Sequence, residues 1–290
     1  MVKYKKNMAD YIFNAVNYFI LLVVGLITVL PFYYILMGSF SPITDIVGGK
    51  LILWPSKFTI EAYRLTLNTN IIPDAYKVTL FISVVGTLIS MVLTVVGAYV
   101  LSKRYLPGRN IMTLFIVITM LFNGGLIPFY LTVNSVGLMN SVWALIIPSC
   151  ISSYNMIVMR NFFQGIPNSL EESAVIDGCS QMGVLTKIIL PISKPVLATI
   201  ALFYMVGYWN SFFQAIIFIS DQKLWPLQLV LRQVLLQSQV ENLLLDNRGA
   251  LPTETIKMAM IIITVLPILF VYPFLQKYFV KGLLIGSVKG

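Results

Sequence analysis

Residues able to carry acid–base or metal chemistry are scarce in this chain of 290 residues. It contains no histidine, which excludes histidine-based catalytic triads, most zinc sites and the usual proton shuttle near neutral pH. The two cysteines, Cys150 and Cys179, have no metal-ligand spacing, and because we expect them at different depths they do not predict a disulfide. We therefore predict no catalytic residue and no metal site. Polar groups are concentrated instead between residues 167 and 195.

The first half of this stretch predicts a short helix that ends in a sharp turn. Ser169 and Glu172 have the spacing of a capping box, in which each side chain bonds the backbone amide of the other residue, so a helix should begin there. Asp177 and Gly178 should end it, because glycine takes the left-handed conformation at little steric cost.

The second half predicts another short helix. Ser180 can cap its start, and Pro191 should stop it. At helical spacing one face would carry four apolar residues, Val184, Leu185, Ile188 and Ile189. Antiparallel membrane helices need only a few residues to connect them, so a capped polar insertion of about 30 residues indicates a docking element rather than a simple link.

The elements that must position this stretch are membrane helices. With 58% hydrophobic and 11% charged residues, and several apolar runs of 18 or more, the composition predicts an all-α polytopic membrane protein. The first apolar run is too long for a signal peptide and lacks a small-residue cleavage site, so we expect a retained helix. We predict a single domain over 1–290 whose six transmembrane helices lie at about 11–37, 73–101, 110–133, 141–163, 196–219 and 255–272. The polar stretch 167–195 would join the fourth and fifth of them.

Lysine and arginine predict the orientation in the membrane. Six helices put both termini on one side, and twelve of the 20 Lys and Arg residues lie in segments facing that side, although the opposite loops are much longer. Both termini and 167–195 are therefore expected in the cytoplasm. The net charge of +9 indicates orientation and contact with lipid headgroups, not a nucleic-acid partner.

Two missing features indicate that energy comes from another protein. The predicted membrane helices hold no acid or base in their middles, whereas ion-coupled carriers and proton pumps usually keep such groups at depth. The sequence also lacks the G-x-x-x-x-G-K-[ST] phosphate loop, so we do not expect this chain to bind ATP. A passive path, set by another subunit's ATP cycle, is the function that fits both observations.

The stretch 167–195 resembles the E-A-A…D-G…I-x-L-P…P loop, the EAA motif, of permease subunits of bacterial ATP-binding-cassette importers. The matching residues are Glu172-Ser173-Ala174, Asp177-Gly178, Ile188, Leu190-Pro191 and Pro195. In that family the loop docks into a groove on a separate ATPase. The resemblance implies a coupling role for Glu172, Ser173, Ala174, Asp177, Gly178, Leu190 and Pro191. The chain departs mildly from the motif at Ser173 and Cys179, which are both small.

The resemblance also implies partners and a location. The chain would pair with a second, homologous permease, two ATPase subunits and an extracellular solute-binding protein in a bacterial plasma membrane. ATP and Mg would bind to the ATPase, and this chain would bind no cofactor and no nucleic acid.

Aromatic and amide side chains gather in the fifth predicted helix, just before an external loop. Rings can stack on the C–H faces of sugars and amides can bind their hydroxyls, which predicts a carbohydrate path. The candidates are Tyr204, Tyr208, Trp209, Asn210, Phe213 and Gln214, with Asn123 as a hinge or gate before Gly124 and Gly125. The alternative is an interfacial aromatic belt with hydrogen bonds between helices, and for Asn123 a plain helix end.

A second resemblance narrows the cargo. The tail 277–290 is similar to that of the oligosaccharide-importing, maltose-permease-like branch, where it extends toward the ATPase. Residues 123–229 resemble the subgroup that serves complex oligo- and polysaccharides, including pectin- and alginate-derived ones. These similarities imply import of an oligo- or polysaccharide, with an acidic pectin- or alginate-derived sugar as one candidate.

Three alternatives remain open at this point. One is a permease of the same family for another small solute. Another is an ion-coupled secondary sugar carrier, which would need an ionisable group at depth. The third, an intramembrane enzyme, would need a nucleophile with a base or a metal site, for which this sequence offers few residues.

Overall fold

The computed structural model describes residues 7–47, 52–68, 71–244 and 254–270, and within these ranges it is helical and contains no β-strand. The chain divides into two compact units, one of Met1–Thr69 with Val234–Val265 and one of Asn70–Gln233 with Leu266–Gly290. The expectation of one domain over 1–290 stays a prediction.

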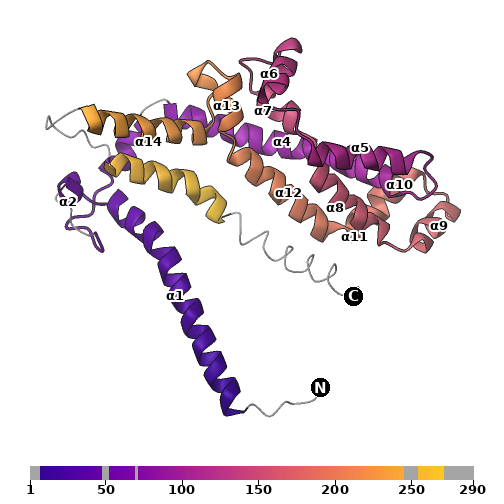
Figure 1. Ribbon diagram of the computed structural model, residues 1–290, viewed down its shortest axis with the longest axis horizontal. Helices are drawn as coiled ribbons and strands as arrows, with labels where there is room; N and C mark the ends of the chain where they lie inside the picture. The colour runs from indigo at the N-terminus through magenta and orange to yellow at the C-terminus, as the bar shows by residue number, and fades with distance from the viewer. Residues whose placement is uncertain (1–6, 48–51, 69–70, 245–253, 271–290) are drawn as a thin grey trace. The chain divides into compact units, whose positions relative to one another are not determined.

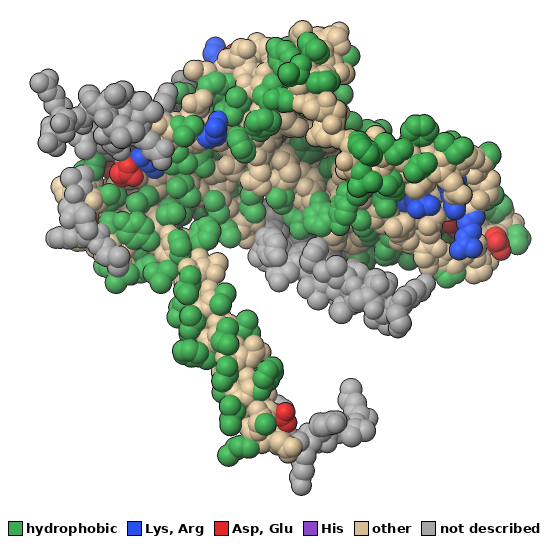
Figure 2. Space-filling view, in the orientation of Figure 1, with side chains coloured by type: hydrophobic (Ala, Val, Ile, Leu, Met, Phe, Trp, Pro, Cys, Tyr) green, Lys and Arg blue, Asp and Glu red, His purple; other side chains and the backbone are tan. Residues whose placement is uncertain are grey.

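Unit 1 contains α1 (Met8–Ser39), α2 (Ile43–Val47), α3 (Glu61–Asn68) and most of the last described helix, 254–270. The Asp10 carboxylate accepts a hydrogen bond from the Asn7 amide at 2.8 Å, which caps α1. Apolar side chains along α1 are exposed, as expected of a helix that lipid surrounds (Figure 2). At its far end the Ser39 and Tyr63 hydroxyls are hydrogen-bonded at 2.7 Å, which joins α1 to α3.

Unit 2 is built around α4 (Ile71–Ser102), which packs against α8 and α12 (Figure 1). The other helices are α5 (Arg109–Leu121), α6 (Leu126–Ser135), α7 (Trp143–Ile146), α8 (Ser153–Gln164), α9 (Asn168–Ile176), α10 (Gln181–Val184), α11 (Leu190–Ile192), α12 (Lys194–Trp209), α13 (Phe213–Phe218) and the start of α14 (Leu227–Leu244). Three single turns complete it, the 3₁₀ turns η1 (Ile147–Ser149) and η3 (Gln222–Leu224) and the π-helical turn η2 (Leu185–Ile189).

Two apolar clusters hold unit 2 together, one toward each end of α4. One cluster joins the end of α4 around Tyr99 to α8, α10, η2 and α12. The other joins the beginning of α4 around Ile82 to α6, α7, α13 and α14. Between them, the ring of Tyr208 lies against Gly86, so close that a β-carbon built on the glycine would come within 2.7 Å of it. Small residues at such contacts let two membrane helices approach closely.

The first two predicted membrane helices are close to the observed α1 and α4. Both are 32 residues long and apolar enough to cross a bilayer. Among the described residues two further spans are possible if each of two bent pairs counts as one: α5 with α6, and 181–192 with α12. The protein is thus an all-helical membrane protein.

The predicted third helix, 110–133, is broken at the segment around Asn123, which the sequence marked as a hinge or a helix end. α5 and α6 meet at a bend of 115° across a break of four residues, 122–125. Gly125 lies at φ +88°, and its amide donates to Asn123 Oδ1 at 3.0 Å. The chain therefore turns where glycine permits a conformation that a helix excludes.

The predicted fourth and fifth helices, 141–163 and 196–219, are also broken. Pro148 lies in η1, where its missing amide is tolerated, and Ser152 then caps α8 by accepting from the Asn155 amide at 3.3 Å. In the fifth segment α12 ends at Trp209, where the backbone amide and the side chain of Asn210 both donate to the Val206 carbonyl at 3.0 Å. The predicted sixth helix, 255–272, corresponds to the described helix 254–270.

Candidate functional site

The stretch 167–195 folds as a helical hairpin of α9 and α10, which is continued by η2 and α11. Helix α9 begins at Asn168, with Pro167 as its N-cap residue and no capping bond from a side chain. The capping box predicted for Ser169 and Glu172 is therefore wrong. Because the helix starts before Ser169, that residue lies inside the first turn, where it cannot act as a cap.

The turn of the hairpin has the predicted geometry. Asp177 ends α9, and Gly178 lies in the left-handed region at φ +83°. The next amide, of Cys179, donates to the Ala174 carbonyl at 2.9 Å and closes the helix end. Ser180 then caps α10 by accepting from the Gly183 amide at 3.2 Å. Both the glycine stop and the serine cap are confirmed.

The prediction that Pro191 stops the second helix is wrong. Helical turns continue through η2 and α11 to Ile192, and the chain changes direction by 86° only at Ser193, where α12 follows. Pro191 lies in the first turn of α11, the position at which a helix needs no amide from that residue.

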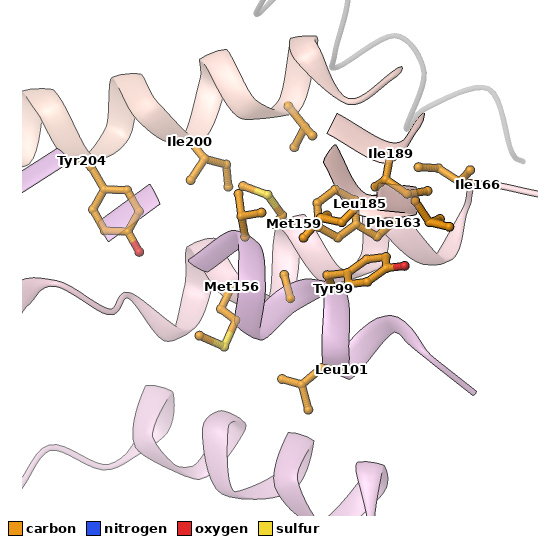
Figure 3. Close-up of a cluster of buried hydrophobic side chains, with 14 of the residues drawn as sticks. Tyr99, Leu101, Met156, Met159, Phe163, Ile166, Leu185, Ile189, Ile200 and Tyr204 are labelled. Atoms are coloured by element: carbon orange, nitrogen blue, oxygen red, sulfur yellow. The ribbon is translucent and has the colours of Figure 1, made fainter. Parts of the chain in front are cut away.

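Apolar packing holds the hairpin against the ends of α4 and α8. The predicted apolar face is buried at Val184, Leu185 and Ile189, and Ile188 packs against the same cluster. Figure 3 shows several members of this cluster from different segments of the chain: Tyr99, Phe163, Ile166, Leu185 and Ile189. Ala174, one of the predicted coupling residues, also belongs to it and is 6% exposed. Its side chain therefore supports α9 from inside the chain.

A polar contact that the sequence did not predict joins α9 to the end of α4. Lys103 forms an ion pair with Glu171, and its ammonium lies 3.9 Å from the centre of the Tyr99 ring. The Tyr99 hydroxyl in turn donates to Gln181 Oε1 at 3.4 Å. These four residues are separated by as many as 82 positions, so no local pattern could have identified them.

The other side of the hairpin is open to solvent. Glu172, Ser173, Asp177 and Gly178 are exposed, as is Pro191, whereas Leu190 packs partly against the core. Ile176, beside the turn, is 85% exposed, and Met182 is 61% exposed. A cleft of about 520 Å³ opens between α9, α8 and the residues after α4, and Glu172 and Arg104 are among the residues that line it.

Two of the predicted path residues, Tyr204 and Tyr208, lie buried between helices. The Tyr204 hydroxyl is 2.7 Å from the Thr94 hydroxyl and accepts from the Ser152 amide at 3.0 Å. The Tyr208 hydroxyl is 2.9 Å from the Ser90 hydroxyl. Both phenols therefore join α12 to α4, which favours the alternative of hydrogen bonding between helices for these two residues.

The remaining predicted path residues lie close to the break that follows α12, except Asn123. Trp209 is buried and packs edge-on against Tyr76, with ring centres 5.9 Å apart. Asn210 accepts from Gln228 Nε2 at 3.1 Å, and Gln214 donates to Ser149 Oγ at 3.1 Å. Phe213 is 55% exposed, and Asn123 is exposed at the break between α5 and α6. Their role in a path stays a prediction.

Comparison with known proteins places this architecture in a family. The family model for the inner membrane component of binding-protein-dependent transport systems matches residues 95–285. The polygalacturonan/rhamnogalacturonan transport system permease protein YtcP of Bacillus subtilis (strain 168) is 46% identical over 98% of this chain and 100% of its own. Protein LplC of the same organism is 49% identical over 97% of this chain and 96% of its own.

A solved structure agrees with these sequence relatives. One chain of the crystal structure of a bacterial ABC transporter involved in the import of the acidic polysaccharide alginate has a TM-score of 0.87 and 33% identity. The similarity covers 95% of this chain and 99% of that chain. The protein therefore belongs to the family of inner membrane components of binding-protein-dependent transport systems.

Proposed function

We propose that this chain is the permease subunit of an ATP-driven importer and that its α9–α10 hairpin receives the motion of a separate ATPase. The observation that carries the proposal is the combination of a firmly anchored base with an exposed tip. Lys103, Glu171 and Ala174 anchor α9 to the rest of unit 2, whereas Glu172, Ile176 and Gly178 are exposed. A rigid protrusion of this kind can transmit the movement of a partner protein to α4 and α12.

The proposed cargo is an oligosaccharide derived from an acidic polysaccharide. Its support comes from relatives: YtcP is named for polygalacturonan and rhamnogalacturonan transport, and the alginate transporter is described as importing an acidic polysaccharide. Both similarities cover nearly the whole chain, so they include every segment that could line a path.

The proposed assembly contains a second permease, two ATPase subunits that bind ATP and Mg, and an extracellular solute-binding protein. The family description, a binding-protein-dependent transport system, supports the last of these partners. We propose six spans: α1, α4, α5 with α6, α7 with α8, α12 with α13, and 254–270. Both termini and the hairpin would face the cytoplasm, because Lys and Arg are concentrated in the segments on that side. The tail 277–290, which we propose extends toward the ATPase, lies outside the described residues.

The experiment uses cells that express the complete transporter with either the wild-type chain or Glu172→Lys. The exposed carboxylate can be reversed in charge without disturbing the Lys103–Glu171 pair, so the chain should still insert in the membrane. We expect the variant to lose co-purification of the ATPase, and uptake of labelled oligogalacturonate to fall by at least about tenfold, because one reversed contact at an interface costs more than about 1.4 kcal/mol.

The matched control is Lys77→Glu, which reverses an exposed charge near the other end of α4. It should leave ATPase co-purification unchanged. Normal ATPase recovery with Glu172→Lys would contradict the docking role, and wild-type uptake that continues after deletion of the ATPase would contradict the importer as a whole. If the ATPase is recovered and required but labelled oligogalacturonate is not taken up, the cargo assignment alone is wrong.

A further inference from the structure

Three arginines lie where α4, α5 and α8 have their ends. Arg104 follows α4, Arg109 is the first residue of α5, and Arg160 lies near the end of α8. Arg160 Nε donates to the Leu101 carbonyl at 3.1 Å, which brings its guanidinium across to the end of α4. Helix α5, which begins at Arg109, packs against α8 as well as against α4. Figure 2 shows Lys and Arg side chains gathered at this end of unit 2, with acidic side chains beside them.

Within the described residues no carboxylate forms an ion pair with these arginines. The hydrogen bonds of their side chains to other side chains go to neutral groups, from Arg109 to Asn110 Oδ1 at 3.4 Å and from Arg160 to Asn161 Oδ1 at 3.3 Å. The ion pair nearby joins Lys103 to Glu171, so the Glu171 carboxylate already has a cationic partner. The sequence contains no Asp or Glu between residues 75 and 170. Of the two glutamates that follow, Glu171 is paired with Lys103, and Glu172 lines the same cleft as Arg104 without forming an ion pair with it. Neighbouring guanidinium groups that are not paired with a carboxylate repel one another, and a bound anion would reduce that repulsion.

An apolar wall continues from this basic cluster along α5. None of the side chains of α5 is buried in unit 2. Its exposed apolar residues run away from Arg109 along the helix: Ile111, Met112, Leu114, Phe115 and Ile118. A small inorganic anion would not contact these apolar side chains. A ligand that matches both parts needs a negatively charged head and long apolar chains.

We propose that Arg104, Arg109 and Arg160 bind the phosphate of an anionic membrane phospholipid whose acyl chains lie along α5. Guanidinium groups suit this role, because they donate two hydrogen bonds at once to a phosphate and remain charged at any physiological pH. A basic cluster between membrane helices at the headgroup level is a recognised setting for such lipids. The bound lipid would fill the space between the helix ends and hold α5 beside α4 and α8.

Native mass spectrometry of the purified full-length chain in neutral detergent tests the proposal. The probes are phosphatidylglycerol and phosphatidylcholine with identical acyl chains. We expect wild type to prefer phosphatidylglycerol, and Arg104→Gln with Arg109→Gln to weaken that preference by about fivefold for each charge removed. Lys77→Gln with Lys223→Gln removes the same charge elsewhere in unit 2 and should leave the preference unchanged.

Equal binding of the two lipids by wild type, or an undiminished preference in the glutamine variant, would overturn the proposal. Displacement of phosphatidylglycerol by excess inorganic phosphate would identify a free-anion site and overturn it too. If the glutamine variant does not fold, Arg104→Lys with Arg109→Lys decides: both charges remain, so the preference should persist, and its loss would contradict a site built on charge.

Discussion

The Lys103–Glu171 ion pair is the side-chain contact that most directly ties the hairpin to the rest of unit 2. Both side chains are largely buried, with 11% and 22% of their surface exposed. Such a pair is stronger than a surface salt bridge, because little water screens it, and its loss leaves one charge unpaired against protein. The neighbouring Glu172, although it belongs to the resembling motif, is exposed and forms no ion pair among the described residues.

Glu171→Gln should therefore loosen α9, whereas the matched control Glu172→Gln should not. We expect the lost pair to cost about 2 kcal/mol, between the values typical of exposed and buried pairs. Amide hydrogen exchange over 170–177 should then become about 30-fold faster in Glu171→Gln. Equal exchange in the two variants would show that apolar packing alone holds the helix.

Some residues whose role is local were predictable, although the capping box at Ser169 and the helix stop at Pro191 were wrong; residues whose role depends on a distant partner were not predictable. The left-handed Gly178 and the Ser180 cap follow from neighbours within a few positions. Glu171 gains its role from Lys103, 68 positions away, and Tyr208 from Ser90, 118 positions away. No spacing rule connects such pairs, so the sequence predicted neither contact.

At the scale of elements, the contact between α4 and α12 depends on a glycine. The Tyr208 ring covers Gly86, and three ring atoms lie within 2.7–2.9 Å of the place that a β-carbon would occupy. The same approach brings the Tyr208 hydroxyl to 2.9 Å from Ser90 and the Tyr204 hydroxyl to 2.7 Å from Thr94. A larger residue at position 86 must push the two helices apart or displace the ring.

Gly86→Ala should lower the free energy of unfolding by about 1–3 kcal/mol, the usual cost of overpacking a close contact. Gly207 on α12 is a matched control, because nothing lies within 4 Å of the point where its β-carbon would stand. Gly207→Ala should leave stability unchanged or raise it by about 0.5–1 kcal/mol, since alanine restricts the unfolded chain. Thermal unfolding of the purified chain measures both. A Gly86→Ala chain as stable as wild type would contradict this packing.

The existence of the long helices followed from composition, but their continuity did not. Long apolar runs predicted α1 and α4 closely, because a membrane helix needs little besides length and hydrophobicity. The sequence marked Asn123 as a hinge or a helix end, but the predicted bounds 110–133 ran across it, and the end of α12 after Trp209 was not predicted. Gly125 and Asn210 mark these two breaks. At the first break the Asn123 side chain accepts from the Gly125 amide, and at the second the Asn210 side chain adds a bond to the Val206 carbonyl, which the Asn210 backbone amide also reaches.

At the scale of the whole molecule, the protein is a membrane component of a transport family, and we propose that another subunit drives it. The family is established from residues 95–285, and similarity to the alginate transporter chain extends over 95% of this chain. The motif in 167–195 and the lack of a phosphate loop pointed to the same family. The motif did not predict which hairpin side chains are exposed, because their exposure depends on how α9 and α10 pack against α4 and α8.

Site-specific photocrosslinking in membranes that contain the complete transporter would show directly whether the hairpin tip meets the ATPase. A photoreactive side chain would replace Ile176 at the hairpin tip, 85% exposed, or Ile127 on α6, 74% exposed, as the matched control. We expect a crosslink from position 176 to the nucleotide-hydrolysing subunit, and none to it from position 127. A crosslink from 176 to lipid alone, with the ATPase present in the same membranes, would contradict the docking role of the hairpin.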